Sequence, residues 1–223
     1  AYIVNASVQL DDDLSTVEGH VLTHGMSAGE EVVISLPEID VSATAQTDDS
    51  GVARFKFEAS LDLWSPSNPK LYEVQIVSDS DQISDRLGFR TIAVEGTQIF
   101  LNGKPIRFRG ISTHEEPIGR DGVAYSRADV DALFGEAKEL GVNFVRAAHY
   151  PYSRHAAKAA DEMGLLLWEE VPIYWNINWE NPETLRIAMD QVARLVQRDW
   201  NRASVVVWSV ANETTYSEPR MAF

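Results

Sequence analysis

The carboxylate of Glu213 and the amide of Asn212 follow an apolar run, in the stretch RASVVVWSVANETTYS (202–217). A continuous apolar run of this length, ended by polar residues, is typical of a buried strand. A carboxylate can give or take a proton in a reaction, and an amide can hydrogen-bond a substrate hydroxyl. The stretch therefore predicts a strand that carries a reactive pair at its carboxyl end.

Three further apolar runs end in chemically active side chains, and one of them also carries Arg146 within the run. The groups concerned are acidic, basic, phenolic and imidazole side chains: His114, Glu115 and Glu116; Arg146, His149 and Tyr150; Glu169 and Glu170. In a (β/α) barrel, the side chains at the carboxyl ends of the strands assemble the active site, whereas the strand bodies pack the core. Four such ends in one sequence predict a shared site more strongly than any single residue does.

The elements that position these groups alternate between strand and helix. Ser126 and Asp129 can form a capping box at the start of a helix that Gly141 ends. A second helix is expected from about 153 to 164, and Pro182 suits the first turn of a third. Strands are expected at 107–113, 143–149, 165–172 and 204–213. This alternation predicts a parallel sheet covered by helices.

The first 93 residues have a different pattern. Short β-rich runs separated by turn residues lie at 16–24, 30–37, 52–60 and 71–79. Several such strands without a helical pattern predict a β-sandwich of immunoglobulin type over 1–93. Near residue 94 the pattern changes, and Asn102-Gly103 between two apolar runs predicts a β-hairpin. The predicted domains are therefore 1–93 and 94–223.

Composition limits the classes of function. The 223 residues are 44% hydrophobic, enough for a sizeable core, and the formal net charge of −15 argues against nucleic acid or an anionic membrane as partner. Residues 1–93 hold 16 acidic and 5 basic side chains, a net of −11, which leaves −4 for 94–223. The chain has no cysteine, so disulfides are excluded and the compartment, cytoplasmic or periplasmic, stays open. No apolar segment approaches the roughly 20 residues that span a bilayer.

Two segments resemble the signatures of a known family. The stretches NFVRAAHYP (143–151) and DWNRASVVVWSVANE (199–213) resemble segments of glycoside hydrolase family 2, which includes β-galactosidases, β-glucuronidases and β-mannosidases. The stretches RFRGISTHEE (107–116) and LWSPSNPKLYEVQI (63–76) are also similar to family segments. The resemblance covers nearly the whole chain and implies a retaining, exo-acting β-glycosidase.

Members of this family order a jelly-roll domain, an immunoglobulin-like sandwich and a TIM barrel. By that resemblance, 1–93 is the sandwich and 94–223 is the first half of the barrel, about four of its eight β/α units. The chain is then expected to be a fragment that carries the acid/base but not the strand-seven nucleophile, and to be inactive alone. Exposed barrel edges would favour self-association or a homo-oligomer.

The resemblance also assigns roles to individual residues. Glu213 corresponds to the acid/base, and Asn212 to the residue that hydrogen-bonds the sugar 2-hydroxyl. His114 and His149 correspond to histidines of the sugar subsite. The alternatives are a turn-capping role or an ion pair with an arginine for Glu213, a turn role for Asn212 and structural roles for the two histidines.

Four further residues have a less direct match. Arg146 is expected to support the site by positioning carboxylates. Glu170 either contributes to the sugar subsite or forms an internal ion pair. Trp175 and Trp179 lie in an aromatic loop, where a ring can stack on a sugar or pack against the barrel rim.

No metal or other cofactor is expected, since the loop VPIYWNINW (171–179) lacks the histidine with which some galactosidases help to bind magnesium. A zinc set of His149, His155 and Glu170 is disfavoured because no two ligands lie one helical turn apart. The expected partner is a β-linked carbohydrate, with a galactoside favoured and a glucuronide next. The alternative from another class is a noncatalytic carbohydrate-binding or scaffolding fragment.

Overall fold

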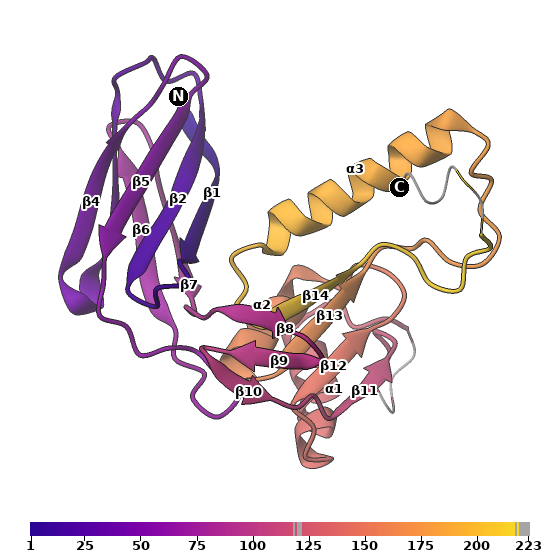
Figure 1. Cartoon of the computed structure of the whole chain (residues 1–223). Coiled ribbons are helices and arrows are strands. Elements are labelled where there is room, and N and C mark those ends of the chain that lie inside the picture. Colours follow the sequence, from indigo (N-terminus) through magenta and orange to yellow (C-terminus); the bar gives the residue numbers. More distant parts are fainter. Residues whose placement is uncertain (118, 120–121, 217, 219–223) are drawn as a thin grey trace. The chain divides into compact units, whose positions relative to one another are not determined.

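The computed structural model describes residues 1–117, 119, 122–216 and 218. The chain divides into two compact units, Ala1–Arg107 and Phe108–Phe223 (Figure 1). Within the described part, no helix is long and apolar enough to cross a bilayer.

The first unit contains two antiparallel sheets that form a sandwich. One sheet has the order β1-β2-β5 and the other the order β4-β3-β6-β7. Their elements are β1 (Tyr2–Leu10), β2 (Thr16–His24), β3 (Glu31–Leu36), the short 3₁₀ helix η1 (Pro37–Ile39), β4 (Val41–Gln46), β5 (Val52–Glu58), β6 (Tyr72–Ser78) and β7 (Gln82–Leu87).

Four of these strands, β2, β3, β5 and β6, are the ones that the sequence predicts. The other three have weaker patterns. In β1 the register shifts between Ile3 and Asn5, which breaks the alternation. The run VSATAQ of β4 is small and polar, and β7 has only Ile83 and Leu87 as large apolar residues. Tertiary pairing, more than local propensity, makes these segments strands.

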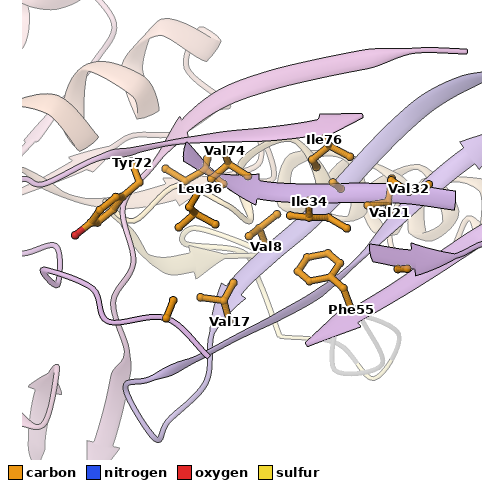
Figure 2. Close-up of a cluster of buried hydrophobic side chains, with 14 of the residues drawn as sticks. Val8, Val17, Val21, Val32, Ile34, Leu36, Phe55, Tyr72, Val74 and Ile76 are labelled. Carbon is orange, nitrogen blue, oxygen red and sulfur yellow. The ribbon is translucent and has the colours of Figure 1, made fainter. Parts of the chain in front are cut away.

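The core of the first unit lies between the two sheets (Figure 2). Alternation along β3 sends Ile34 into this core, where it is fully buried, while the neighbouring Val33 is 37% exposed. Val8 and Val17 from one sheet and Val74 from the other belong to the same cluster. The sandwich is therefore held by side chains of both sheets.

This alternation makes a test of the sandwich possible within one strand. Ile34→Ala is expected to lower the free energy of unfolding of the first unit by about 2–5 kcal/mol, because it leaves a cavity. Val33→Ala, the matched control, should cost less than about 1 kcal/mol. Chemical denaturation measures both, and equal losses from the two variants would contradict the sandwich register.

The first unit ends in a small sheet of order β10-β9-β8, with β8 (Ile92–Glu95), β9 (Gln98–Leu101) and β10 (Lys104–Ile106). The predicted hairpin at Asn102-Gly103 is confirmed, since β9 pairs antiparallel with β10 across these two residues. Both have positive φ, 52° and 70°, which suits a two-residue hairpin turn. The Asn102 side chain also donates to the carbonyl of Trp64, a fully buried residue, at 3.0 Å.

The second unit is built on a parallel sheet of order β11-β12-β13-β14, which confirms the predicted alternation and parallel pairing. Its elements are β11 (Gly110–Thr113), α1 (Arg127–Glu139), β12 (Phe144–Ala147), α2 (Arg154–Met163), β13 (Leu166–Glu170), α3 (Pro182–Asp199) and β14 (Val205–Ser209). The predicted extent of the fourth strand, 204–213, is wrong at its end, because β14 stops at Ser209.

The helix boundaries follow the local signals. The Ser126 and Asp129 side chains form the predicted capping box of α1, and Gly141 follows its end with φ 72°. Gly164 ends α2 in the left-handed conformation. Asn181 caps α3 by accepting from the Glu183 backbone N–H at 3.0 Å.

The parallel sheet has two chemically different faces. One face packs on α1 and α2 through Val145, Ala147, Leu167 and Val205. By alternation, the opposite face of β12 and β13 carries Phe144, Arg146, Trp168 and Glu170. Glu169 and Glu170, adjacent in sequence, therefore point to opposite sides of the sheet.

Candidate active site

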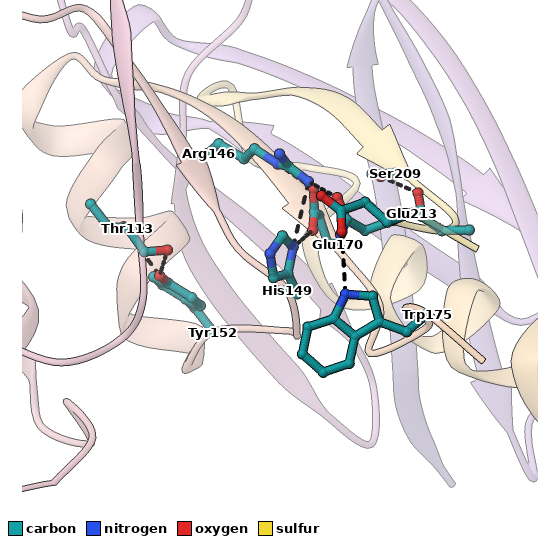
Figure 3. Close-up of polar contacts among 10 residues, drawn as sticks. Thr113, Arg146, His149, Tyr152, Glu170, Trp175, Ser209 and Glu213 are labelled. Atoms are coloured by element: carbon teal, nitrogen blue, oxygen red, sulfur yellow. Dashed lines mark hydrogen bonds and ion pairs between the residues drawn. The ribbon is translucent and has the colours of Figure 1, made fainter. Parts of the chain in front are cut away.

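The guanidinium of Arg146 joins three neighbouring strand ends. It stands on β12 and donates through Nε to Glu170 Oε1 at 2.5 Å and through Nη2 to Asn212 Oδ1 at 2.7 Å (Figure 3). Its guanidinium carbon also lies 4.9 Å from the ring centroid of Trp168. The Glu170 side chain is only 2% exposed, so its charge is balanced within the protein rather than by water.

His149 completes the shell around Glu170. Its Nδ1 lies 2.7 Å from Glu170 Oε2 and 3.4 Å from Arg146 Nη2. Since a carboxylate only accepts, and a guanidinium only donates, the shorter contact assigns the proton to Nδ1. Nδ1 then donates to Glu170, and Nε2 is the ring nitrogen left to meet a ligand. Both oxygens of Glu170 are thus bound by side chains of β12 and the segment after it.

Glu213 lies beyond the end of β14, next to Trp175. It is exposed to solvent, and its Oε2 accepts a hydrogen bond from Trp175 Nε1 at 3.2 Å. Backbone contacts continue the pairing of β13 and β14 past their ends, because Tyr174 and Asn212 form a parallel bridge. This pairing brings the carboxylate to the same edge of the sheet as Asn212, although the strand itself ends earlier.

His114 joins the site through aromatic contacts. Its ring centroid lies 5.7 Å from that of His149 in an edge-on arrangement and 6.2 Å from that of Tyr150. The His149 ring is in turn 6.0 Å from Tyr174. The segment after β11 therefore meets the segment after β12, which in turn meets the segment after β13.

The structure brings all the predicted site residues to one edge of the sheet. Direct contacts or chain neighbours connect them in one set: His114, Arg146, His149, Glu170, Trp175, Asn212 and Glu213. The ion pair foreseen as one alternative for Glu170 is present. The two tryptophans of the loop differ, since Trp175 is 63% exposed and Trp179 only 4%, packed with Val171 and Leu195.

Glu115 has a structural role that the sequence does not reveal. This buried carboxylate accepts from the backbone N–H of Ser153 at 2.7 Å, at the start of α2, where the Ser153 side chain makes no capping bond. Burial raises the pKa of Glu115, and the hydrogen bond from the Ser153 backbone N–H opposes that rise. A negative group at a helix N-terminus is favourable, so Glu115 stabilises the segment that follows His149. The contact spans 38 residues, beyond the reach of local patterns.

Glu169, on the helix side of the sheet, is the second buried carboxyl group of β13. It is 2% exposed, and among the described atoms its Oε2 has no hydrogen-bond partner. Burial raises its pKa well above the usual value, the nearby Asp199 raises it further, and Arg198, whose Nη2 lies 3.7 Å from Oε1, lowers it. Arg198 is itself bound to Asp199, with Nε 2.6 Å from Oδ2. One cation therefore serves two carboxyl groups, which favours the protonated form of Glu169.

The raised pKa of Glu169 has a definite effect on stability. Protonated Glu169 stabilises the fold fully below the unfolded pKa of about 4.5, and this contribution is lost as pH rises through the folded pKa. Glu169→Gln imitates the protonated form, so its stability relative to the native chain should improve as pH increases. Denaturation of both proteins at pH 5 and pH 8 measures the change.

The matched control is Glu183→Gln. Hydrogen bonds from Arg186 lower the pKa of this exposed carboxyl, so its effect on stability should not change between pH 5 and 8. A difference between Glu169→Gln and the native chain that is independent of pH would show that Glu169 is ionised in the fold.

Among the described residues, no group of three or more His, Asp or Glu side chains is placed to hold a metal ion. The possible zinc set of His149, His155 and Glu170 is thus not assembled. The geometry is that of a polar site built from carboxylates, an amide, imidazoles and one guanidinium.

Comparison with known proteins decides the family. Residues 92–222 match the model described as glycosyl hydrolases family 2, TIM barrel domain, and residues 1–90 match the model described as glycosyl hydrolases family 2. The chain belongs to glycosyl hydrolase family 2. The resemblance noted at 143–151 and 199–213 is therefore confirmed for the family.

Related family 2 sequences carry two activities in their names. The β-glucuronidase of Streptococcus agalactiae serotype V is 33% identical over 238 residues, which cover 96% of this chain and 38% of that protein. The β-galactosidase of Thermoanaerobacterium thermosulfurigenes is 34% identical over 156 residues, or 66% of this chain and 21% of that protein. The family 2 chain thus spans less than half the length of these relatives.

Solved structures agree with the fold. The β-galacturonidase of Eisenbergiella tayi bound to galacturonate has a TM-score of 0.82 and 26% identity, over 96% of this chain and 41% of that one. The Bifidobacterium dentium β-glucuronidase complexed with coumarin-3-O-glucuronide has a TM-score of 0.86 over 99% of this chain and 39% of that one. At 24% identity, the latter supports the fold alone.

Proposed function

We propose that this family 2 chain supplies the acid/base part of a retaining, exo-acting β-glycosidase site, with Glu213 as the acid/base. The observation that carries the proposal is the position of Glu213, exposed at the sheet edge where Arg146 joins Glu170 and Asn212. In this proposal residues 1–93 form an immunoglobulin-like sandwich, and 94–223 provide the first four β/α units of a TIM barrel.

The reaction needs a proton carrier and a nucleophile. Protonated Glu213 would give its proton to the departing glycosidic oxygen as the bond to the anomeric carbon breaks, and a second carboxylate would form the glycosyl–enzyme bond. The Glu213 carboxylate would then take a proton from the water that hydrolyses this bond. In retaining enzymes the two carboxyl groups lie about 5–5.5 Å apart.

Glu170 is not assigned as that nucleophile. Arg146 binds one of its oxygens and His149 the other, so neither is available to attack a sugar without breaking an ion pair. We assign it a positioning role for Arg146 and His149. By family resemblance, the nucleophile is a strand-seven Glu that lies outside this chain.

Asn212 and the histidines provide sugar contacts in this proposal. Because Asn212 Oδ1 accepts from Arg146, its amide nitrogen is the group directed to a ligand, where it can donate to a sugar 2-hydroxyl. His149 presents Nε2, and His114 lies beside it. The orientation of all three depends on contacts that exist without substrate.

The substrate class is a terminal β-linked sugar, with a β-galactoside first and a β-glucuronide next. Relatives with both names resemble this chain at 33% and 34% identity, so identity alone does not rank them. A panel of aryl β-galactosides, β-glucuronides and β-galacturonides, assayed with the longest natural protein that contains this sequence, would identify the glycone.

A noncatalytic carbohydrate-binding fragment is the second candidate. It is favoured by the commitment of Glu170 to Arg146 and His149, which leaves Glu213 as the one exposed carboxylate of the connected set defined above. Binding of a sugar by the 223-residue chain without turnover would agree with both candidates. Turnover by the longest natural protein that contains this sequence, and its dependence on Glu213, separates them.

Replacing the proposed acid/base tests the catalytic role. In the longest natural protein that contains this sequence, Glu213→Gln should lower kcat/KM about 10²–10⁴-fold for aryl glycosides with phenol-like leaving groups. Glu180→Gln, an exposed acid outside the set, is the control and should retain activity. Full activity of Glu213→Gln would refute the assignment.

The chain alone should not turn over substrate, because a retaining reaction needs both carboxylates. The measurement is release of an aryl aglycone by the purified 223-residue protein. Turnover that disappears in Glu213→Gln would contradict this expectation, since it would mean that the chain contains a complete catalytic pair.

A further inference from the structure

The indole of Trp175 contacts the proposed acid/base from the neighbouring strand end. Its Nε1–H donates to Glu213 Oε2 at 3.2 Å, and Figure 3 shows the ring below this carboxylate. The Trp175 side chain is 63% exposed, so packing in a core does not dictate its position. The contacts that position the ring are its hydrogen bond to Glu213 and an edge-on contact with Tyr174, whose ring centroid lies 5.4 Å away.

Backbone contacts hold this loop against the segment that carries Glu213. The Asn212 N–H donates to the Ile173 carbonyl at 2.8 Å, and the Trp175 N–H donates to the Asn212 carbonyl at 3.2 Å. Asn212 is thus bound by its main chain on both sides and by its side chain to Arg146. The indole and the carboxylate are carried by two segments whose register is fixed.

Both residues of the pair have the left-handed backbone conformation, with φ 59° at Trp175 and 50° at Glu213. Residues other than glycine rarely adopt it, because the Cβ approaches the following carbonyl oxygen. Such conformations persist where the surroundings over-determine them, which is common at functional sites. Here they occur in the two residues that the Nε1–Oε2 hydrogen bond joins.

The hydrogen bond distinguishes the two oxygens of Glu213. An indole N–H can only donate, so the oxygen that it contacts is held as an acceptor. We propose that Trp175 is a positioning residue for Glu213, which keeps Oε2 as the acceptor and leaves Oε1 to carry the transferred proton. This inference rests on the acid/base role proposed for Glu213 above.

In this scheme the proton moves only at Oε1. It passes from Oε1 to the glycosidic oxygen as the carbon–oxygen bond breaks, and the electron pair of that bond stays with the departing alcohol. The nucleophilic carboxylate forms the new bond to the anomeric carbon. In the second step water gives a proton to Oε1 and its oxygen bonds to the anomeric carbon, while the bond to the nucleophilic carboxylate breaks and its electron pair stays with that carboxylate. The exposed face of the indole can flank the departing group throughout.

Trp175→Phe separates the donor from the ring, because it removes the N–H and keeps an aromatic surface. In the longest natural protein that contains this sequence, it should lower kcat/KM about tenfold for phenol-like leaving groups. The loss should be less than about threefold for a dinitrophenyl glycoside, whose departure needs no proton. Tyr174→Phe is the control in the same loop. It should leave unchanged the ratio of kcat/KM for the phenol-like leaving group to kcat/KM for the dinitrophenyl group.

The outcomes are distinguishable. An equal loss with both leaving groups would overturn the proposal, because Trp175 would then be a stacking platform only. Glu213→Gln run in parallel reports on the proposed function, since an acid/base variant must lose more with phenol-like groups than with dinitrophenyl. If Glu213→Gln shows no such difference, the function fails, whatever Trp175→Phe does.

A second measurement needs no activity and uses the 223-residue chain. The Trp175 indole N–H resonance, identified by its absence in Trp175→Phe, should shift in Glu213→Gln more than those of the other tryptophans, because its acceptor loses its charge. An unchanged Trp175 resonance would overturn the proposal. Thermal unfolding of Trp175→Phe should match the native chain, as expected for an exposed ring.

Discussion

The bridge from Arg146 to Glu170 and Asn212 is the constraint on which the site depends. Three segments, β12, the end of β13 and the residues after β14, reach one guanidinium. A carboxylate as buried as Glu170 is costly without a charged partner, and removing one member of a buried pair typically costs about 3–5 kcal/mol. The pair is therefore a condition for the sheet edge to form, and it also orients the amide of Asn212 and the ring of His149.

Successive side chains of a strand point to opposite faces of the sheet, so the adjacent carboxyl groups of Glu169 and Glu170 lie in different surroundings. Glu170 faces the site, where Arg146 and His149 bind its oxygens. Glu169 faces the helices, where burial and Asp199 raise its pKa and Arg198 is shared. Both carboxyl groups are buried, so each affects the structure through the side chains that it contacts. The exposed acid of the set, Glu213, lies on the adjacent segment, where the pairing of Tyr174 with Asn212 holds it at the same edge.

Local signals in the sequence predict much of this arrangement. The capping box at Ser126, Gly141 after α1 and the Asn102-Gly103 turn are decided by neighbouring residues, and each is found in place. The convergence of four strand ends follows from the parallel sheet, and it places the predicted site residues together. The end of β14 at Ser209 could not be predicted, because the residues that follow it stay paired through the β13 loop without forming a strand. The contact of Glu115 with α2 depends on tertiary structure alone.

A double-mutant cycle between Arg146 and Glu170 tests the central claim most directly. The experiment compares the native chain with Arg146→Met, Glu170→Gln and the double variant. Chemical denaturation of each whole chain gives the free energy of unfolding of its second unit. A bound, buried pair predicts that the two effects are strongly non-additive, with a coupling of about 2 kcal/mol or more and Arg146→Met the more harmful single change. Effects that add within about 0.5 kcal/mol would contradict the account, because the strand ends would then not be joined through this ion pair.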